Sequence, residues 1–138
     1  MKIATWNVNS LKVRLPHVLQ WLETAQPDIL GLQETKLTDE NFPVAEIEGA
    51  GYHVVFSGQK TYNGMAILSR QPVSDVVMDL PGLKDPQRRV LGATIGSVRF
   101  LDLYVPNGQS VGSEKYTYKL DWLAACRDYL AEQLQSHE

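Results

Sequence analysis

Short apolar runs separated by polar positions open the chain. Residues 3–8 favour a β-strand, and residues 29–32 form a second apolar run that fits a buried strand. Between them, apolar residues recur with helical spacing, which predicts a helix that begins at Pro16 and ends before Pro27. Strand, helix and strand in this order predict two parallel neighbouring strands joined by a right-handed crossover.

The middle of the chain predicts a series of short strands, at residues 52–57, 65–69, 73–80, 89–95 and 98–105. Asn63-Gly64 predicts a tight turn between the first two of these strands, and Gly96-Ser97 joins the last two into a hairpin. The segment from Leu80 to Gln87 contains two prolines and a glycine, so we expect a loop there.

The last part of the chain carries the clearest helical pattern. A row at spacings of three and four predicts a helix, and its members are Tyr116, Leu120, Leu123, Arg127, Leu130 and Leu134. Ser113 precedes this row and is a candidate N-cap. The complete order of strand, helix, several strands and helix predicts an α/β fold with a mixed sheet, in one domain over residues 1–138.

Composition narrows the class of protein. Apolar residues make up 43% and charged residues 21%, which is typical of a globular domain. The net charge of −3 gives no general attraction for nucleic acid, so any such contact needs a local basic patch. A single cysteine, Cys126, excludes a disulfide framework or a cysteine metal site and favours a reducing, cytoplasmic location. No apolar run approaches a bilayer span, and the N-terminus lacks the apolar core of a secretion signal.

The ends of the first two predicted strands carry the first candidate chemistry. Asn7 ends one strand and Glu34 follows the other. Because ligands gather at the carboxyl ends of parallel strands, the two side chains are expected to meet at one edge of the sheet. A carboxylate and an amide suit Mg²⁺, which keeps several water ligands. The alternative is that Glu34 is a solvated loop residue and Asn7 a turn former.

Later segments add groups that can bind phosphate. Tyr104 and Asn107 lie where another strand ends and can both donate hydrogen bonds, whereas the alternative is a strand terminator with a packed tyrosine. Arg88 and Arg89 offer guanidinium groups, which bind phosphate well, but such pairs also occur as solvent-exposed residues at the start of a strand. Lys36 is open to the same two interpretations. Gly-rich nucleotide-binding patterns and HExxH are absent from the sequence, which removes those classes of enzyme.

Five segments together resemble one protein family. They are IATWNVNSL, QPDILGLQETK, NGMAILSR, QRR and LYVPNG, in this order along the chain. The set is similar to bacterial exonuclease III, in the abasic-site (AP) endonuclease branch of the endonuclease/exonuclease/phosphatase superfamily. The resemblance implies a four-layer α/β sandwich with two mixed sheets and outer helices. It also implies Mg²⁺-dependent hydrolysis of DNA phosphodiesters at abasic sites, with 3′-to-5′ exonuclease and 3′-phosphatase activity; Mn²⁺ is an alternative metal.

The resemblance also assigns roles to individual residues. Glu34 matches the metal-binding glutamate and Asn7 the active-site asparagine, while Tyr104 matches the tyrosine that hydrogen-bonds the scissile phosphate. The positions that line the cleft or contact DNA are Asn9, Lys36, Arg88, Arg89 and Asn107. The implied partner is double-stranded DNA with abasic sites or 3′ ends, with no membrane.

One departure from the family pattern affects the expected activity. Family members run to about twice this length, and their second half carries the acids and the Asp-His pair that activate water. These groups are not found here, so we expect the N-terminal half of the domain and a catalytically incomplete chain. If only one sheet is encoded, its bare apolar face should cause self-association. The alternatives are a non-catalytic half-domain, a DNA-binding remnant, or a phosphatase or phosphodiesterase of the same superfamily.

Overall fold

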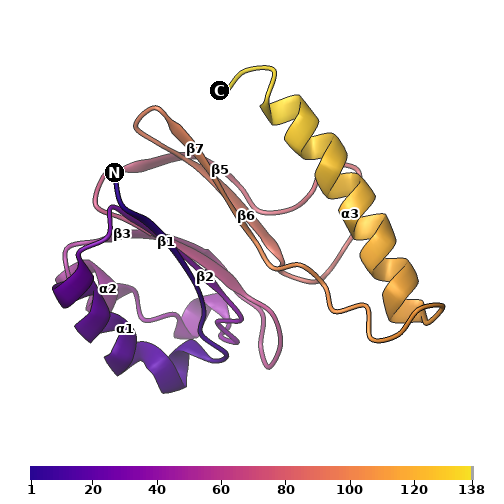
Figure 1. Ribbon diagram of the computed structural model, residues 1–138. Helices are drawn as coiled ribbons and strands as arrows, with labels where there is room; N and C mark the ends of the chain where they lie inside the picture. Colours follow the sequence, from indigo (N-terminus) through magenta and orange to yellow (C-terminus); the bar gives the residue numbers. More distant parts are fainter. Residues whose placement is uncertain (138) are drawn as a thin grey trace. The chain divides into compact units, whose positions relative to one another are not determined.

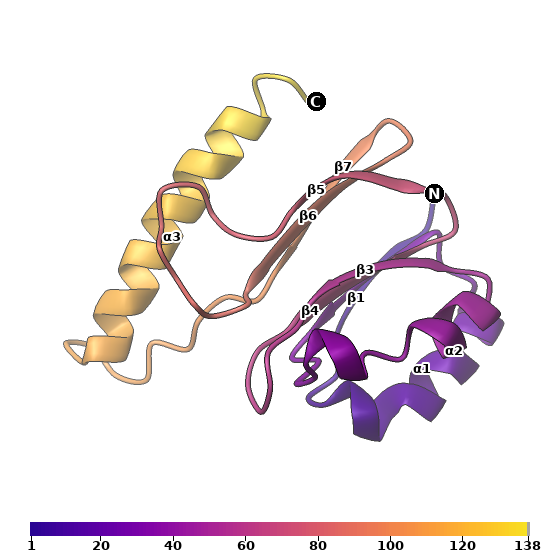
Figure 2. The same ribbon diagram turned by 180° about the vertical axis from the view of Figure 1, so that it is seen from behind.

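The computed structural model describes residues 1–137 and divides into two compact units. Unit 1 comprises Met1–Met78 and Gln87–Tyr104, and unit 2 comprises Asp79–Pro86 and Val105–Glu138. Figures 1 and 2 show the chain from two opposite sides, with unit 1 containing every strand.

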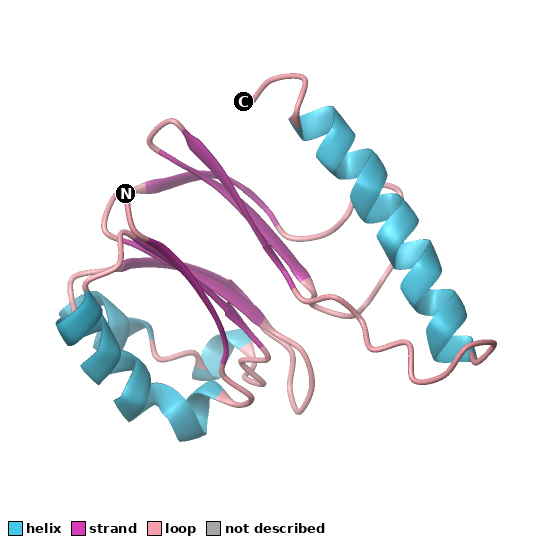
Figure 3. Cartoon of the chain, viewed as in Figure 1, coloured by secondary structure: helices cyan, strands magenta, loops and turns pink. Residues whose placement is uncertain are grey.

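Unit 1 contains two β-sheets and two α-helices (Figure 3). Its elements are β1 (Ile3–Asn7), α1 (Leu11–Ala25), β2 (Ile29–Gln33), the 3-10 turn η1 (Asp39–Asn41), α2 (Val44–Gly49), β3 (His53–Ser57), β4 (Met65–Ser69), β5 (Val73–Val77), β6 (Val90–Ile95) and β7 (Val98–Leu103). The first sheet has the order β1-β2-β4-β3, and the second has the order β5-β6-β7. β1 and β2 are parallel and every other pair is antiparallel, which confirms the predicted α/β class with a mixed sheet.

Two apolar cores hold the layers of unit 1 together. One lies between the four-stranded sheet and the helices α1 and α2, which cover the same face of that sheet in Figures 1 and 2. The other joins the two sheets, and its fully buried members are Ile29, Met65, Ile67, Leu91, Ala93 and Ile95. All five residues of β2 are buried because both faces of this strand are covered.

A second sheet is present, so the condition under which the sequence predicted a wholly bare sheet face is not met. A single sheet would have left a broad apolar face bare, but the inner faces of β2 and β4 pack against β6. The open part of the inner face lies on β1, where Ile3 is 49% exposed and Thr5 is also exposed. Self-association through an uncovered face stays a prediction.

Helix α1 begins earlier than the sequence predicted. It starts at Leu11, and Pro16 lies inside it rather than at its first position. The backbone amides of Ser10 and Leu11 donate to the carbonyl oxygens of Glu34 and Thr35, at 2.8 and 3.0 Å. These contacts fix the start of the helix, although Pro16 has no N–H to donate to the preceding turn. The end was predicted correctly, because Gln26 adopts the left-handed conformation and donates to Leu22.

The connection between β3 and β4 also differs from its prediction. Ser57 pairs with Met65, so the whole of residues 58–64 forms the connection instead of a two-residue turn. Asn63 and Gly64 do have positive φ angles, of 57° and 89°, as a tight turn requires. The local conformation was therefore predicted correctly, but the loop around it is longer. The hairpin of β6 and β7 through Gly96-Ser97 is confirmed.

Unit 2 contains α3 (Glu114–Gln133), and the predicted N-cap is confirmed because the Ser113 hydroxyl accepts a hydrogen bond from the Tyr116 amide at 3.1 Å. The predicted helix is confirmed, but the row that carried the prediction is not its buried face. Trp122, Cys126 and Tyr129 are buried, whereas the leucines of the predicted row, Leu120, Leu123, Leu130 and Leu134, are exposed. Both rows have helical spacing. The buried row contains Trp122 and Tyr129, whose side chains bury more apolar area than leucine does. Within residues 1–137, none of the helices combines the length and apolar character needed to cross a bilayer.

Candidate functional site

Four loops of unit 1 are joined by backbone hydrogen bonds at the carboxyl ends of β1 and β2. The loop after β1 pairs with the loop after β2 through Val8, Ser10 and Leu11. The loop after β2 then pairs with the β3–β4 loop, and Gly64 of that loop donates to the carbonyl oxygen of Arg88 at 3.0 Å. A further bond of 2.8 Å runs from the Tyr104 amide to the Arg89 carbonyl. The backbone therefore fixes all of these segments relative to one another.

Asn7 and Glu34 meet as predicted. The side-chain amide of Asn7 donates to Oε2 of Glu34 at 2.6 Å, although 27 positions separate the two residues. Their approach follows from the register of the parallel pair, in which Asn7 lies opposite Gln33, the residue before Glu34. Glu34 remains partly exposed, with 22% of its side chain accessible. A carboxylate is thus held in a fixed position with one side open to a ligand.

Asn9 and Lys36 extend this cluster. The Lys36 ammonium donates to Oδ1 of Asn9 at 2.6 Å and lies 3.8 Å from Oε1 of Glu34. The Asn9 backbone amide donates to Oδ1 of Asn7 at 3.1 Å. The amide oxygen of Asn7 is therefore engaged by the backbone, which leaves its N–H groups facing Glu34. This arrangement fixes the orientation of both amide side chains.

Tyr104 joins the same cluster from the end of β7. Burial raises the pKa of the Tyr104 phenol above its usual value, and the charge of Glu34 and a hydrogen bond to Glu34 raise this pKa further. The Arg89 guanidinium opposes these effects, and its central carbon lies 4.5 Å from the centre of the Tyr104 ring. Arg89 also donates to the Tyr104 carbonyl at 3.3 Å. Tyr104 consequently remains a protonated hydrogen-bond donor at neutral pH.

The backbone at the cluster is strained. Asn9, Glu34 and Lys36 have φ angles of 43°, 56° and 55°, in the left-handed region that favours glycine. Such residues typically cost about 1–3 kcal/mol each and gather at functional sites, where the fold holds them in place. Glu34 and Lys36 are not among the residue types enriched in this conformation. Their strain therefore supports a functional site at this edge of the sheet.

Two of the predicted site residues are not part of the described contacts of this cluster. Arg88 is held through its backbone, because its amide donates to Oε1 of Gln59 at 2.9 Å. Asn107 lies in unit 2, where its Oδ1 accepts from the Gln109 amide at 2.8 Å. Their roles in DNA binding remain predictions.

The donor set of the cluster fits a magnesium ion that keeps most of its water. Mg²⁺ in proteins commonly uses one or two carboxylates, with waters and substrate phosphates completing its shell. Glu34 supplies one carboxylate, and Asn7 orients it through an N–H group while the Asn7 oxygen accepts from the Asn9 backbone. Within the part of the chain that the structure describes, no three His, Cys, Asp or Glu residues gather around one point. The cluster therefore supplies few protein ligands.

Sequence reasoning missed a buried polar network beside the cluster. The Gln33 side-chain amide donates to Oδ1 of Asp102 at 2.6 Å and to the Thr5 hydroxyl at 2.9 Å. Burial raises the pKa of Asp102 to about 8, and this outweighs the hydrogen bond from Gln33 and the backbone of Leu32, which lower it. Gly31 permits the close approach, since a Cβ atom there would lie 2.9 Å from Oδ1 of Asp102. The sequence did contain one sign of this network, because Asp102 is a charged residue between two leucines on a predicted strand.

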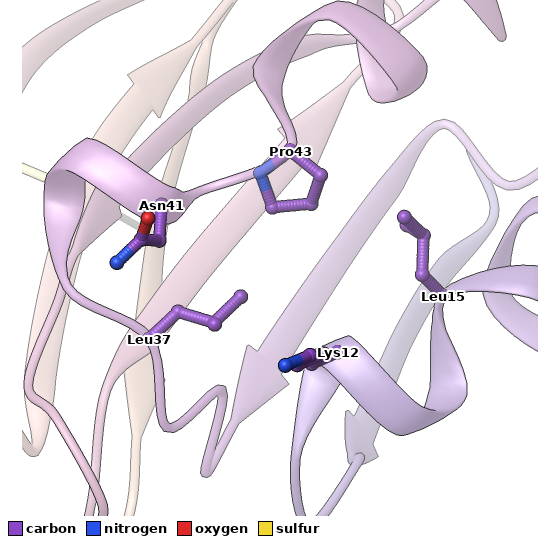
Figure 4. A pocket seen from close by; sticks show the side chains of 5 residues that line it. All are labelled: Lys12, Leu15, Leu37, Asn41 and Pro43. Atoms are coloured by element: carbon purple, nitrogen blue, oxygen red, sulfur yellow. The ribbon is translucent and has the colours of Figure 1, made fainter.

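A cavity of about 380 Å³ lies between α1 and the segment after β2 (Figure 4). Its lining residues are Lys12, Leu15, Leu37, Asn41 and Pro43. The side chains that Figure 4 labels carry no carboxylate and surround a mainly apolar space. This cavity is therefore a poorer candidate for metal chemistry than the cluster around Glu34.

The chain is similar to several known enzymes that act on DNA. The chain is 36% identical to exodeoxyribonuclease III of Haemophilus influenzae, over 96% of this chain and 52% of that protein. It is 50% identical to the 3′ phosphatase NExo from Neisseria, solved with a product DNA hairpin, with a TM-score of 0.97 over 99% of this chain and 54% of that one. An AP endonuclease from Archaeoglobus fulgidus is 45% identical, with a TM-score of 0.92 over 96% of this chain and 51% of that one.

These relatives share the fold described above and are longer than this chain. The chain spans about half the length of the curated relatives it matches. The match to the solved structures confirms the predicted fold class, half of an α/β sandwich with mixed sheets and helices. Residues 4–138 match the Endonuclease/Exonuclease/phosphatase family, and the chain belongs to that family.

Proposed function

We propose that this chain carries the metal-binding and phosphate-orienting part of a nuclease that hydrolyses DNA phosphodiesters at abasic sites, with 3′-to-5′ exonuclease activity. The observation that supports this most directly is the contact between Asn7 and Glu34 at the ends of two parallel strands, with Tyr104 beside them. The proposed substrate is double-stranded DNA with abasic sites or 3′ ends. Residues 1–138 would form part of one domain of this kind, in the cytoplasm, where the single buried Cys126 stays reduced.

Each residue of the cluster has a proposed task. Glu34 would hold Mg²⁺, or Mn²⁺ in its place, and Asn7, which was predicted as a second ligand, would fix the Glu34 carboxylate through its N–H group. The metal, when bound, supplies positive charge that polarises a phosphodiester and stabilises its leaving oxygen. Tyr104 donates a hydrogen bond to a phosphate oxygen, because its raised pKa keeps the phenol protonated. The proposed DNA contacts are Asn9, Lys36, Arg88, Arg89 and Asn107.

The chain alone is proposed to be a poor catalyst. Hydrolysis needs a group that takes a proton from the attacking water. Near Glu34 the described charged partner is Lys36, and no cluster of three His, Cys, Asp or Glu side chains occurs in residues 1–137. A hydrogen-bonding cluster that orients phosphate without a base is expected to bind DNA ends better than it cleaves them. Self-association through the open inner face of β1 remains a further prediction.

Incision of abasic duplex DNA by the purified chain tests this proposal. With Mg²⁺, we expect a rate far below that of a full-length relative, and Glu34→Gln should abolish what remains. Asp39→Asn, which alters an exposed acid outside the cluster, serves as the control. Robust, EDTA-sensitive incision that Glu34→Gln removes would show that the chain is catalytically complete. Incision that Glu34→Gln leaves unchanged would overturn the assigned site.

A 3′ phosphatase is the second candidate, because NExo, 50% identical to this chain, carries that description. A panel of duplexes ending in a 3′-phosphate, a 3′-hydroxyl or an internal abasic site separates the two activities. Preferential release of inorganic phosphate would favour the phosphatase. Binding to all three without any product would favour a non-catalytic, DNA-binding half-domain.

A further inference from the structure

One side chain in the connection between β3 and β4 bonds to two separate parts of the candidate site. Gln59 lies in this connection and is partly exposed. Its Oε1 atom accepts a hydrogen bond from the side-chain amide of Asn63 at 3.1 Å and another from the backbone amide of Arg88 at 2.9 Å. A carbonyl oxygen has two lone pairs, so these two donors use its full capacity as an acceptor. Gln59 therefore joins the β3–β4 connection to the residues before β6.

Asn63 extends this contact to the segment after β2. Its carbonyl oxygen accepts a hydrogen bond from the Lys36 amide at 3.0 Å, and Asn63 itself is 6% exposed. Lys36 has a φ angle of 55° and Asn63 one of 57°. Residues in this left-handed region keep their conformation only where the surrounding structure determines it. The bond between Gln59 and Asn63 therefore helps to hold Lys36 in place.

The neighbouring Gly64 shows how closely the connection packs against the same segment. Its carbonyl oxygen accepts from the Thr35 amide at 3.2 Å, and a Cβ atom on Gly64 would collide with the buried Thr35 hydroxyl. The Gly64 amide also donates to the Arg88 carbonyl oxygen at 3.0 Å. The Arg88 backbone is thus bonded on both sides, with its N–H on Gln59 and its C=O on Gly64. A shift of Arg88 would therefore have to break a bond to the connection.

Arg89 links the same segment to Tyr104. The Tyr104 amide donates to the Arg89 carbonyl oxygen at 2.8 Å, and the guanidinium carbon of Arg89 lies 4.5 Å from the centre of the Tyr104 ring. The position of the Arg88–Arg89 pair therefore affects Tyr104 as well as any contact that the two arginines make to phosphate.

We propose that Gln59 is a positioning residue of the candidate site, which fixes Lys36 through Asn63 and fixes the backbone of Arg88 directly, so that the two cations keep a constant separation for binding DNA phosphates. This inference rests on the proposed function, since Lys36 and Arg88 are two of its proposed DNA contacts. The role requires an acceptor oxygen, because both bonds of Gln59 are made by its Oε1 atom. Loss of this oxygen should disturb Lys36, which is bonded to Asn63 and not to Gln59 itself.

Two substitutions of Gln59 separate the effect of its oxygen from that of its size. Gln59→Met keeps the length of the side chain and removes the acceptor, so the Arg88 amide should exchange its proton about tenfold faster. The Lys36 amide should also exchange faster and change its chemical shift, although its own acceptor is untouched. Gln59→Glu keeps an acceptor oxygen and should restore both amides toward their wild-type behaviour.

Gln71→Met is the matched control, because it makes the same change at an exposed glutamine directly after β4. It should alter neither the Arg88 nor the Lys36 amide. Circular dichroism checks that each variant folds. If Gln59→Met unfolds, Gln59→Asn gives the same comparison, since it keeps the amide group and withdraws the oxygen by one methylene.

Binding of abasic duplex DNA to the full chain tests the functional part of the inference. Fluorescence anisotropy with Mg²⁺ at several salt concentrations gives the dissociation constant and its salt dependence. Gln59→Met should raise the dissociation constant about tenfold, because a charged hydrogen-bonding partner of phosphate is displaced. It should also lower the slope of the logarithm of the dissociation constant against the logarithm of salt concentration by about one. Gln71→Met should bind as the wild type does.

The outcomes separate this inference from the proposed function. Unchanged exchange and chemical shift of the Lys36 amide in Gln59→Met would overturn the positioning role. Failure of Gln59→Glu to restore that amide, or DNA binding by Gln59→Met equal to that of the wild type, would overturn it too. A wild-type chain that does not bind abasic DNA would contradict the proposed function, and the exchange of the Lys36 amide would then decide the positioning role.

Discussion

Gln33 and Asp102 connect the two sheets of unit 1 through a hydrogen bond of 2.6 Å, across 69 positions of sequence. Gln33 directly precedes Glu34, so the same short segment anchors the sheets and carries the candidate metal ligand. The bond is made to a carboxyl group that burial keeps protonated at neutral pH, since its pKa is raised to about 8. This combination makes the stability of the sheet pair dependent on pH.

The free energy of unfolding should fall as pH rises from about 4 to about 8. The usual pKa of 3.8 applies to Asp102 in the unfolded chain, and about 8 applies in the folded one. Between these pKa values the folded state holds one more proton than the unfolded state. The stabilisation that this proton supplies is therefore complete below the lower pKa. It decreases by on the order of 1 kcal/mol per pH unit as the pH approaches the upper pKa. Asp102→Asn should remove this dependence. Urea unfolding at pH 4, 6 and 8 measures it, and equal slopes for both proteins would contradict it.

Glu34 should control the acidity of Tyr104. The negative charge of Glu34 and its hydrogen bond with Tyr104 both raise the pKa of the phenol. Glu34→Gln removes that charge, so the pKa of Tyr104 should fall toward its usual value. Titration of the ring carbon that bears the hydroxyl, by NMR of labelled tyrosine, measures this change for each tyrosine separately. Tyr62 in the β3–β4 loop is the internal control, and an unchanged pKa of Tyr104 would place it outside the influence of Glu34.

Gly31→Ala should destabilise the protein by roughly 1–3 kcal/mol. The added methyl group would lie 2.9 Å from Oδ1 of Asp102 and 3.2 Å from the Phe100 ring, so the two sheets would have to separate slightly. Gly49→Ala is the matched control, because a Cβ atom there meets nothing within 4 Å. Thermal or denaturant unfolding of both variants decides the question. Equal stability of the two would mean that the sheets tolerate extra volume between β2 and β7.

Ser113→Ala should cost about 1 kcal/mol of stability in α3, because it removes the hydroxyl that accepts from the Tyr116 amide. Ser10 occupies the corresponding position before α1 but makes no such bond, since the loop after β2 accepts from the backbone there. Ser10→Ala should therefore have a much smaller effect. Circular dichroism and urea unfolding of both variants measure this contrast. An equal loss of stability in the two variants would mean that the Ser113 side chain does not stabilise its helix as a cap.

The elements that depend on local pattern could be predicted from the sequence. The strand before Asn7, the strand before Glu34 and their parallel pairing follow from short-range periodicity and the chirality of the crossover. The start of α1 could not be predicted in this way. It depends on hydrogen bonds from Ser10 and Leu11 to residues far along the chain, and these override the local preference of Pro16 for a first turn.

The candidate site shows the same division. Asn7 and Glu34 were predicted to meet because strand ends determine their position, and they do. The Asp102 network was not predicted, since it depends on the packing of one sheet against another. The buried face of α3 could not be predicted, because two rows have helical spacing and only tertiary packing selects the row of Trp122. The assigned roles of the DNA-contacting residues remain predictions.

The two outer strands of the smaller sheet differ in a way that limits assembly. The pairing of β5 with β6 shifts register between Ser74 and Val77, and Asp75 there has a φ angle of 49°. Such a bulge twists an outer strand and makes it a poor template for another chain. The opposite strand β7 keeps regular pairing throughout its length. Within residues 1–137, β7 is therefore the more regular template for a neighbouring strand and β5 the poorer one.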